Sequence, residues 1–145
     1  MNIRQYHTDD KFLLLELFQL NTPAYFSVDE EKDFIHYLNN ELEQYFVIEL
    51  NNKIAGCGGI NFSDNKQTGK ISWDIFHPQY QNQGLGTALL KHRISILQSM
   101  PIVKCIIVRT SQQAYKFYQK NGFKTKEIVK DYWAKGYDLY LMEYI

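Results

Sequence analysis

Two glycines spaced two residues apart, Gly84 and Gly86, lie between a strand-like and a helix-like segment. Residues 70–76 alternate as a strand does, Pro78 ends that pattern, and apolar residues recur with helical spacing from Leu85 onward. In a tight strand–loop–helix connection, backbone N–H groups and the positive end of the helix dipole converge on one place. Glycine lets these amides approach phosphate oxygens with no Cβ in the way. The segment therefore predicts a cradle for a pyrophosphate.

The glycine pair alone is also compatible with a tight turn that binds nothing, because such pairs often precede helices. A Walker loop is excluded, since no Gly-Lys-Ser/Thr follows. A dinucleotide fingerprint fits poorly because Leu89 fills its last glycine position and no β-α-β unit starts the chain. A second motif is needed to decide between the turn and the cradle.

Length and composition indicate one globular domain, residues 1–145, with a substantial core. Hydrophobic residues make up 45% and charged residues 22%, which is ordinary for such a domain. Lys plus Arg equals Asp plus Glu at 16 each, so no basic field would attract nucleic acid. No nucleic-acid partner is expected.

Targeting and redox signals point to a soluble cytoplasmic protein without a membrane partner. The N-terminal residues lack the apolar core of a signal peptide, and the apolar run 12–20 is too short to span a bilayer. Cys57 and Cys105 lie in predicted strands without His or Cys at metal-ligand spacing. Both are expected to be buried thiols in a reducing compartment, and no metal site is expected.

Strand and helix patterns alternate along the chain. Period-two or continuous apolar patterns predict strands at residues 2–6, 45–50, 54–62, 70–76, 103–108, 123–129 and 138–144. Helical patterns cover residues 8–21, 27–40, 85–100 and 111–120. The order β-α-α-β-β-β-α-β-α-β-β predicts an α+β fold, a mixed sheet flanked by helices.

Local signals support these boundaries. Ser27 with Glu30, and Thr110 with Gln113, have the spacing of capping boxes at the starts of two helices. Gly122 offers a left-handed position after the last helix.

In the central strands, Asn51-Asn52 suits a two-residue hairpin turn. Three glycines at 56, 58 and 59 thin the following strand, which implies a bulge or a close-packed neighbour. Ile71, Trp73 and Ile75 alternate along the next strand, as residues that share one face do.

Two segments resemble the signatures of the GCN5-related N-acetyltransferase (GNAT) family. Residues 81–86, QNQGLG, resemble the family's Q/R-x-x-G-x-G/A motif between a strand and a helix. Residues 114–123, AYKFYQKNGF, resemble its A-x-x-F-Y-x-x-x-G-F motif. Either motif alone is weak, but both lie on the expected elements and the element order matches the family fold, with its mostly antiparallel sheet. The resemblance covers the whole chain.

The resemblance implies an acetyl-CoA-dependent N-acetyltransferase that transfers acetyl directly to a primary amine. By position, the cofactor-binding residues would be Phe76, Gln81, Gln83, Gly84, Leu85, Gly86, Thr87 and Ser111. The backbone from Gln83 to Thr87 would bind the pyrophosphate, and Phe76 would present backbone groups to the pantetheine arm and the oxyanion. Many relatives have Asn where this chain has Ser111, whose hydroxyl can still donate a hydrogen bond.

Tyr118 stands where the family places the general acid that protonates the leaving thiolate. A phenol pKa of about 10 lies near a thiol pKa of about 8.5, so the proton transfer is feasible. The alternative is a core tyrosine on an amphipathic helix. Asp74 shares a strand face with Phe76 and could accept the amine's proton, directly or through water; the alternative is a solvated or salt-bridged carboxylate. His77 precedes Pro78 and is better explained by a turn.

The remaining charged and aromatic candidates are less specific. Lys91, Arg93, Lys116 and Lys120 could attract CoA phosphates, but helix-surface charges are usually just solvated. In relatives, the loops that contain Tyr25-Phe26 and Tyr132-Trp133 border the acceptor, so these aromatics are either its walls or lids over the core.

The acceptor is expected to be a small-molecule amine, and dimers are frequent in the family, so a homodimer is left open. A non-catalytic acyl-CoA-binding sensor or partner subunit is the alternative function. A protein-modifying enzyme is a third option.

Overall fold

The computed structural model describes residues 1–145 and contains one seven-stranded sheet of order β1-β2-β3-β4-β5-β7-β6. All neighbouring strands are antiparallel except β4 and β5, which are parallel. The strands are β1 (Asn2–Gln5), β2 (Gln44–Leu50), β3 (Lys53–Ser63), β4 (Thr68–Phe76), β5 (Cys105–Thr110), β6 (Phe123–Ala134) and β7 (Tyr137–Tyr144). The predicted α+β fold and element order are confirmed.

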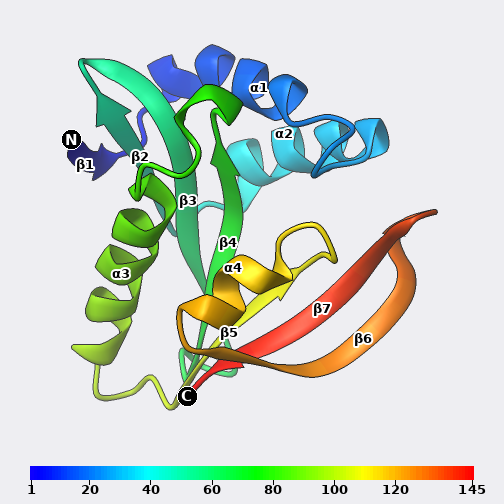
Figure 1. Cartoon of the computed structure of the whole chain (residues 1–145). Coiled ribbons are helices and arrows are strands. Elements are labelled where there is room, and N and C mark those ends of the chain that lie inside the picture. The colour runs from blue at the N-terminus through cyan, green and yellow to red at the C-terminus, as the bar shows by residue number, and fades with distance from the viewer.

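Helices cover both faces of the sheet (Figure 1). The helices are α1 (Lys11–Leu20), α2 (Glu31–Asn40), α3 (Leu85–Gln98) and α4 (Tyr115–Lys120). Helices α1 and α2 bury an aromatic-rich cluster against one face, and α3 and α4 bury the larger cluster against the other. None of the helices combines the length and apolarity needed to cross a bilayer.

Strands β4 and β5 pair only at their beginnings, over four residues each, and their later separation creates the cleft. The parallel register runs from Thr68 with Cys105 to Ile71 with Val108 and stops there. Both strands continue, β4 to Phe76 and β5 to Thr110, without further pairing to each other. Their unpaired ends diverge between the two helical layers (Figure 1).

A β-bulge in β4 changes which residues share a face. Between the pairs Cys57–Ile75 and Gly59–Ser72, β3 advances two residues and β4 three, and Trp73 has φ +50°. The expectation that Ile71, Trp73 and Ile75 share one face is therefore wrong. Ile71 packs on the α3 side, whereas Trp73 and Ile75 pack under α1 and α2. The extra residue reverses the alternation after Ser72.

Several local predictions are confirmed. The Ser27 hydroxyl accepts from the Asp29 amide, while Glu30 accepts from the Ser27 amide and closes the capping box. The turn residues Asn51 and Asn52 both have positive φ, 53° and 64°, as a type I′ hairpin requires. Gly122 has φ +98° after α4.

The second predicted capping box is wrong, because α4 begins at Tyr115 and its N-cap, Ala114, makes no side-chain cap. Residues 111–114 form a turn whose Ser111 carbonyl accepts from the amides of Ala114 and Tyr115. Gln112 explains why the chain turns here. Its side chain donates to the Gly136 carbonyl and accepts from the Asp138 amide, which ties the turn to the β6–β7 hairpin. That hairpin is also tighter than expected, since β6 extends to Ala134.

The glycines of β3 do have close-packed neighbours. A Cβ on Gly58 would lie 2.3 Å from Asp74 Oδ1 and 2.7 Å from Arg93 Nη1. These two side chains form an ion pair inside the protein. A side chain at position 58 would therefore displace that pair.

We predict that Gly58→Ala lowers the free energy of unfolding by about 1–3 kcal/mol, because the added methyl overpacks the ion pair. Urea denaturation measures the change. Ser95→Ala on the exposed face of α3 is the control and should stay within about 0.5 kcal/mol of wild type. A Gly58→Ala variant as stable as the control would contradict this account of Gly58.

Candidate active site

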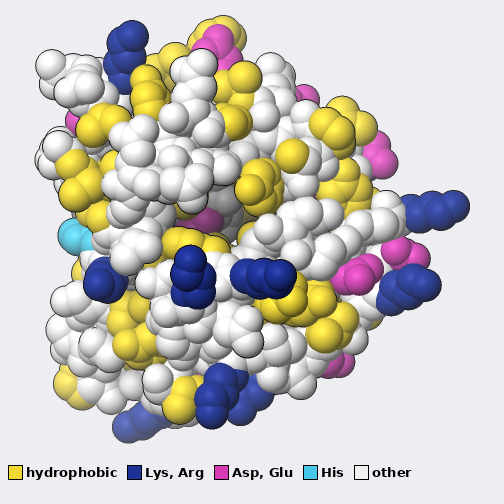
Figure 2. Space-filling view, in the orientation of Figure 1, with side chains coloured by type: hydrophobic (Ala, Val, Ile, Leu, Met, Phe, Trp, Pro, Cys, Tyr) yellow, Lys and Arg dark blue, Asp and Glu magenta, His cyan; other side chains and the backbone are white.

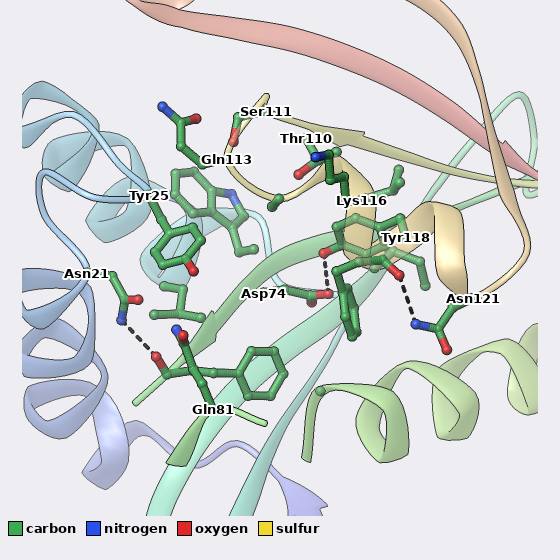
Figure 3. A pocket seen from close by; sticks show the side chains of 18 of the residues that line it. Asn21, Tyr25, Asp74, Gln81, Thr110, Ser111, Gln113, Lys116, Tyr118 and Asn121 are labelled. Carbon is green, nitrogen blue, oxygen red and sulfur yellow. Dashed lines mark hydrogen bonds between the residues drawn. The ribbon is translucent and has the colours of Figure 1, made fainter. Parts of the chain in front are cut away.

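A cleft of about 760 Å³ opens where β4 and β5 separate. Its walls come from β4, β5, the loop before α3, helix α4 and the segment 21–30 between α1 and α2. Figure 2 shows this hollow near the centre of the molecule, with Lys and Arg side chains along one rim and acidic atoms at its base. Figure 3 shows Asn21 and Tyr25 on one side of it and Lys116 and Tyr118 on the other.

The loop before α3 presents free backbone amides. Asn82 and Gly84 have φ of 67° and 79°, and Gly84 is the N-cap of α3. The first helical bond runs from the Ala88 amide to the Gly84 carbonyl, and no acceptor of the protein meets the amides of residues 83–87. Four N–H groups are normally orphaned at a helix N-terminus, and here they point to no internal cap. An anion is the natural partner for such a turn.

Most of the predicted cofactor-binding residues line this cleft: Phe76, Gln81, Gly84, Leu85, Gly86, Thr87 and Ser111. Gln83 does not line the cleft, and its side chain is exposed. The prediction that Gln83 binds the cofactor therefore depends on its backbone amide alone. His77 Nδ1 accepts from the Gln79 amide, at 3.1 Å, which confirms its turn role.

Asn21 holds the end of β4 in place. Its buried amide group donates to the Leu17 carbonyl at 2.8 Å. It also donates to the Phe76 carbonyl at 3.0 Å (Figure 3). One side chain thereby joins the end of α1 to the end of β4. Sequence reasoning missed Asn21, and the only available signal was its position just after a helix, where Asn often stands.

Three polar side chains meet at the base of the cleft. Arg93 is fully buried and donates from Nη1 and Nη2 to the two oxygens of Asp74, at 2.5 and 3.0 Å. Tyr118 donates its hydroxyl to Asp74 Oδ2 at 2.6 Å (Figure 3). Arg93 also donates to the carbonyls of Gly59 and Leu89, so its donors are largely satisfied. The structure thus brings together the two residues predicted as catalytic, with Arg93 as their common support.

Burial and Asp74 set the protonation state of Tyr118. Burial raises the pKa of the Tyr118 phenol well above 10, and the neighbouring Asp74 carboxylate raises it further. Burial lowers the pKa of Arg93, but the charge and hydrogen bonds of Asp74 outweigh this and raise it overall. At neutral pH, Tyr118 is a neutral hydroxyl and Arg93 a cation. Elsewhere, burial raises the pKa of the Cys57 thiol to about 12, which makes it an inert core thiol.

The expectation that Arg93 is a solvated helix charge is wrong. Lys91 is exposed, but Arg93 stands four residues after Leu89 and lies on the buried face of α3. That spacing was visible in the sequence and could have identified Arg93 as an internal cation. Lys116 and Lys120 of α4 are exposed and line the cleft.

The predicted acceptor aromatics divide into two groups. Tyr25, Phe26 and Trp133 line the cleft, whereas Tyr132 does not. Phe26 also packs on Phe18, with ring centroids 5.0 Å apart, so it is both a wall and a lid over the core. Trp73, at the bulge, lines the cleft as well and was not among the predicted site residues.

We predict that Arg93→Met costs about 3–5 kcal/mol of stability, because it leaves the Asp74 carboxylate buried without its cation. Replacing both partners, Asp74→Leu with Arg93→Met, should restore much of the loss, since an apolar pair of similar volume needs no compensating charge. Urea denaturation of the single and double variants gives the coupling energy. Additive losses in this cycle would show that the two side chains do not act as a pair.

Comparison with known proteins shows which family the chain resembles. The model of the acetyltransferase (GNAT) family matches residues 14–123. An N-alpha-acetyltransferase of Sulfurisphaera tokodaii is 29% identical over 135 residues, 84% of this chain and 77% of that protein. The mouse cysteine-rich protein 2-binding protein is 31% identical over 96 residues, 66% of this chain, and the match spans only 12% of that protein.

Among solved structures, an aminoglycoside 6′-N-acetyltransferase complexed with coenzyme A superposes with a TM-score of 0.76 at 14% identity, over 99% of this chain and 96% of the other. At that identity the likeness concerns the fold. The match of the family model over most of the chain, on the elements that build the cleft, shows that this protein belongs to the acetyltransferase (GNAT) family.

Proposed function

We propose that the protein is an N-acetyltransferase that transfers the acetyl group of acetyl-CoA directly to a primary amine of a small molecule. One observation carries this proposal: the uncapped amides of residues 84–87 and the Tyr118–Asp74 pair belong to the same cleft. Phosphate binding and proton transfer can therefore serve one bound molecule. The N-alpha-acetyltransferase relative and the coenzyme A complex of the same fold support the donor.

The residues present fit coenzyme A. The amides at the N-terminus of α3 would hold its pyrophosphate, and Lys116 and Lys120 would face its remaining phosphate charge. The opening between β4 and β5 suits the pantetheine arm, because unpaired strand ends leave backbone groups available there. Bound acetyl-CoA would supply an activated thioester carbonyl.

The chain's own groups would then manage charge and protons. A backbone amide near Phe76 would stabilise the negative charge that develops on the carbonyl oxygen. As the new N–C bond forms and the C–S bond breaks, the Tyr118 hydroxyl would protonate the departing sulfur. Asp74 would take the amine's proton through a water molecule bound to its Oδ1. This oxygen is the more available of the two, because it accepts one hydrogen bond in the protein and Oδ2 accepts two.

The alternative, an acyl-CoA-binding module without turnover, is favoured by one observation. The Tyr118 proton is already engaged by Asp74, and the raised phenol pKa makes this hydroxyl a weaker acid than free tyrosine. A binding module would need the cradle but no acid. Turnover on any amine decides between the two functions.

We predict that the protein releases thiol from acetyl-CoA with at least one amine of a broad panel, and that Tyr118→Phe lowers kcat by about 10- to 10,000-fold. Tyr115→Phe, a Tyr→Phe change on the same helix, is the matched control and should retain activity. Coenzyme A at millimolar concentration should raise the Tm of all three proteins equally.

Each failure in this experiment has a distinct meaning. No thermal shift with coenzyme A would refute the cradle and the function together. A thermal shift without thiol release on any amine would establish the binding module. Unchanged turnover in Tyr118→Phe would remove Tyr118 from the mechanism.

We predict that deprotonation of Tyr118 does not lower kcat/KM at any pH below about 10. The raised pKa of its phenol keeps Tyr118 protonated below that pH. Asp74→Asn removes a charge that raises this pKa and leaves Arg93, whose charge lowers it. The alkaline limb of the pH profile should therefore move to lower pH in Asp74→Asn. The limb's position, rather than the absolute rate, is the readout, with circular dichroism confirming the fold. An unmoved limb would show that Asp74 does not set the acidity of Tyr118.

A further inference from the structure

One carboxylate in the cleft has no cationic partner. Glu30 lines the cleft at the start of α2 and is only 7% exposed. Its Oε2 accepts from the Ser27 amide at 2.8 Å, but none of the protein's four ion pairs includes Glu30. The other acid that lines the cleft, Asp74, is paired with Arg93. Glu30 therefore has no cationic side chain to balance its charge at the cleft wall.

The second oxygen of Glu30 is available to a ligand. Oε1 has no hydrogen-bond partner in the protein. No fully buried side-chain oxygen of the chain lacks a partner, so Oε1 must contact solvent. The cleft is a solvent space that Glu30 borders. Burial raises the pKa of this carboxyl, because the charged form loses hydration there, and the hydrogen bond from the Ser27 amide offsets this only in part.

Aromatic side chains line the same end of the cleft. Tyr25 and Phe26 belong to the loop that leads to Glu30, and Trp73 of β4 packs on Phe26 and lines the cleft as well. The Phe26 and Trp73 rings lie 6.0 Å apart, so they form a continuous apolar surface. Aromatic faces attract organic cations, and a carboxylate beside them adds a charged hydrogen-bond acceptor.

The cations of the cleft are placed elsewhere. Lys116 lies on α4, across the cleft from Asn21 and Tyr25 (Figure 3). Lys120 lies on the same helix and also lines the cleft. Lys70 lies on β4. Arg109, on β5, stacks on the hairpin aromatics Tyr132 and Trp133, at 5.1 and 5.6 Å from their centroids. None of them pairs with Glu30.

We propose that the acceptor is a diamine or polyamine whose second, protonated amine binds Glu30 Oε1 among these aromatic rings. This inference rests on the proposed acetyl transfer and names its substrate class. The protonated amine would supply the positive charge that Glu30 has no side chain to provide. The alkyl chain of the diamine could be buried against the aromatic walls. The reacting amine would stand at the other end of the same molecule, near the Phe76 backbone, as a neutral base.

The test compares α,ω-diamines of increasing chain length with n-alkylamines of the same length as acceptors. We expect the best diamine to exceed its matched monoamine in kcat/KM by about tenfold or more. Glu30→Gln keeps the capping bond, since Gln also serves at this position of a capping box, and removes only the charge. It should lower kcat/KM for the diamine by about 10- to 100-fold, mainly through KM, and leave the monoamine within about twofold.

Asp29→Asn, an exposed neighbour with the same charge change, is the matched control and should alter neither substrate. A wild type that prefers monoamines, or a Glu30→Gln variant that affects both classes equally, would overturn the proposal. Calorimetry of diamine binding to the coenzyme A-loaded protein tests the cation site at Glu30 separately from the proposed acetyl transfer. Diamine binding that Glu30→Gln abolishes, without thiol release on any amine, would keep the cation site and refute the acetyltransfer.

Discussion

The buried ion pair of Asp74 and Arg93 is the interaction on which the cleft depends. It joins β4 to α3, and its Asp74 end also accepts the hydroxyl of Tyr118 from α4, so three elements are fixed by one carboxylate. A buried pair of this kind gains little net stability over apolar side chains, because both charges must leave water. What it supplies is placement: a carboxylate and a phenol held at the point where β4 and β5 separate.

Two irregularities of the backbone make that placement feasible. The bulge at Trp73 turns Asp74 toward α3 and α4; with unbroken alternation from Ile71, Asp74 would face α1 and α2 instead. Gly58 on the adjacent strand leaves the space that the ion pair fills. A positive φ at a tryptophan is strained and persists only where the surrounding structure enforces it. Here the Trp73 ring is held among Phe26, Phe34 and Tyr37, so aromatic packing on one face of the sheet fixes the polar group on the other.

Much of the fold and of the candidate site could be predicted from the sequence, and the features that could not have physical reasons. Element order, the Ser27–Glu30 capping box and the Asn51-Asn52 turn follow from local chemistry, which periodicity and turn residues report directly. The glycine loop before α3 was equally local. Helical spacing from Leu89 indicated the buried face for Arg93, but its partner, Asp74 of β4, is distant in sequence and could not be assigned from the pattern. The start of α4 was misplaced because Gln112 bonds to the β6–β7 hairpin, a tertiary contact that outweighed the expected cap. The bulge could not be placed, since three glycines in β3 allowed several registers.

The distribution of charge also bears on how two substrates could share one cleft. Free amides and the lysines of α4 favour an anion on one side, whereas Glu30 and the aromatic rings favour a cation on the other. Asp74 and Tyr118 lie between, with their charge balanced by Arg93. An anionic donor and a cationic acceptor would therefore each be drawn to its own side, with the reactive ends meeting at the separation of β4 and β5. Such an arrangement orders both reactants before the bond forms, which is the main contribution a scaffold can make to a reaction between two bound molecules.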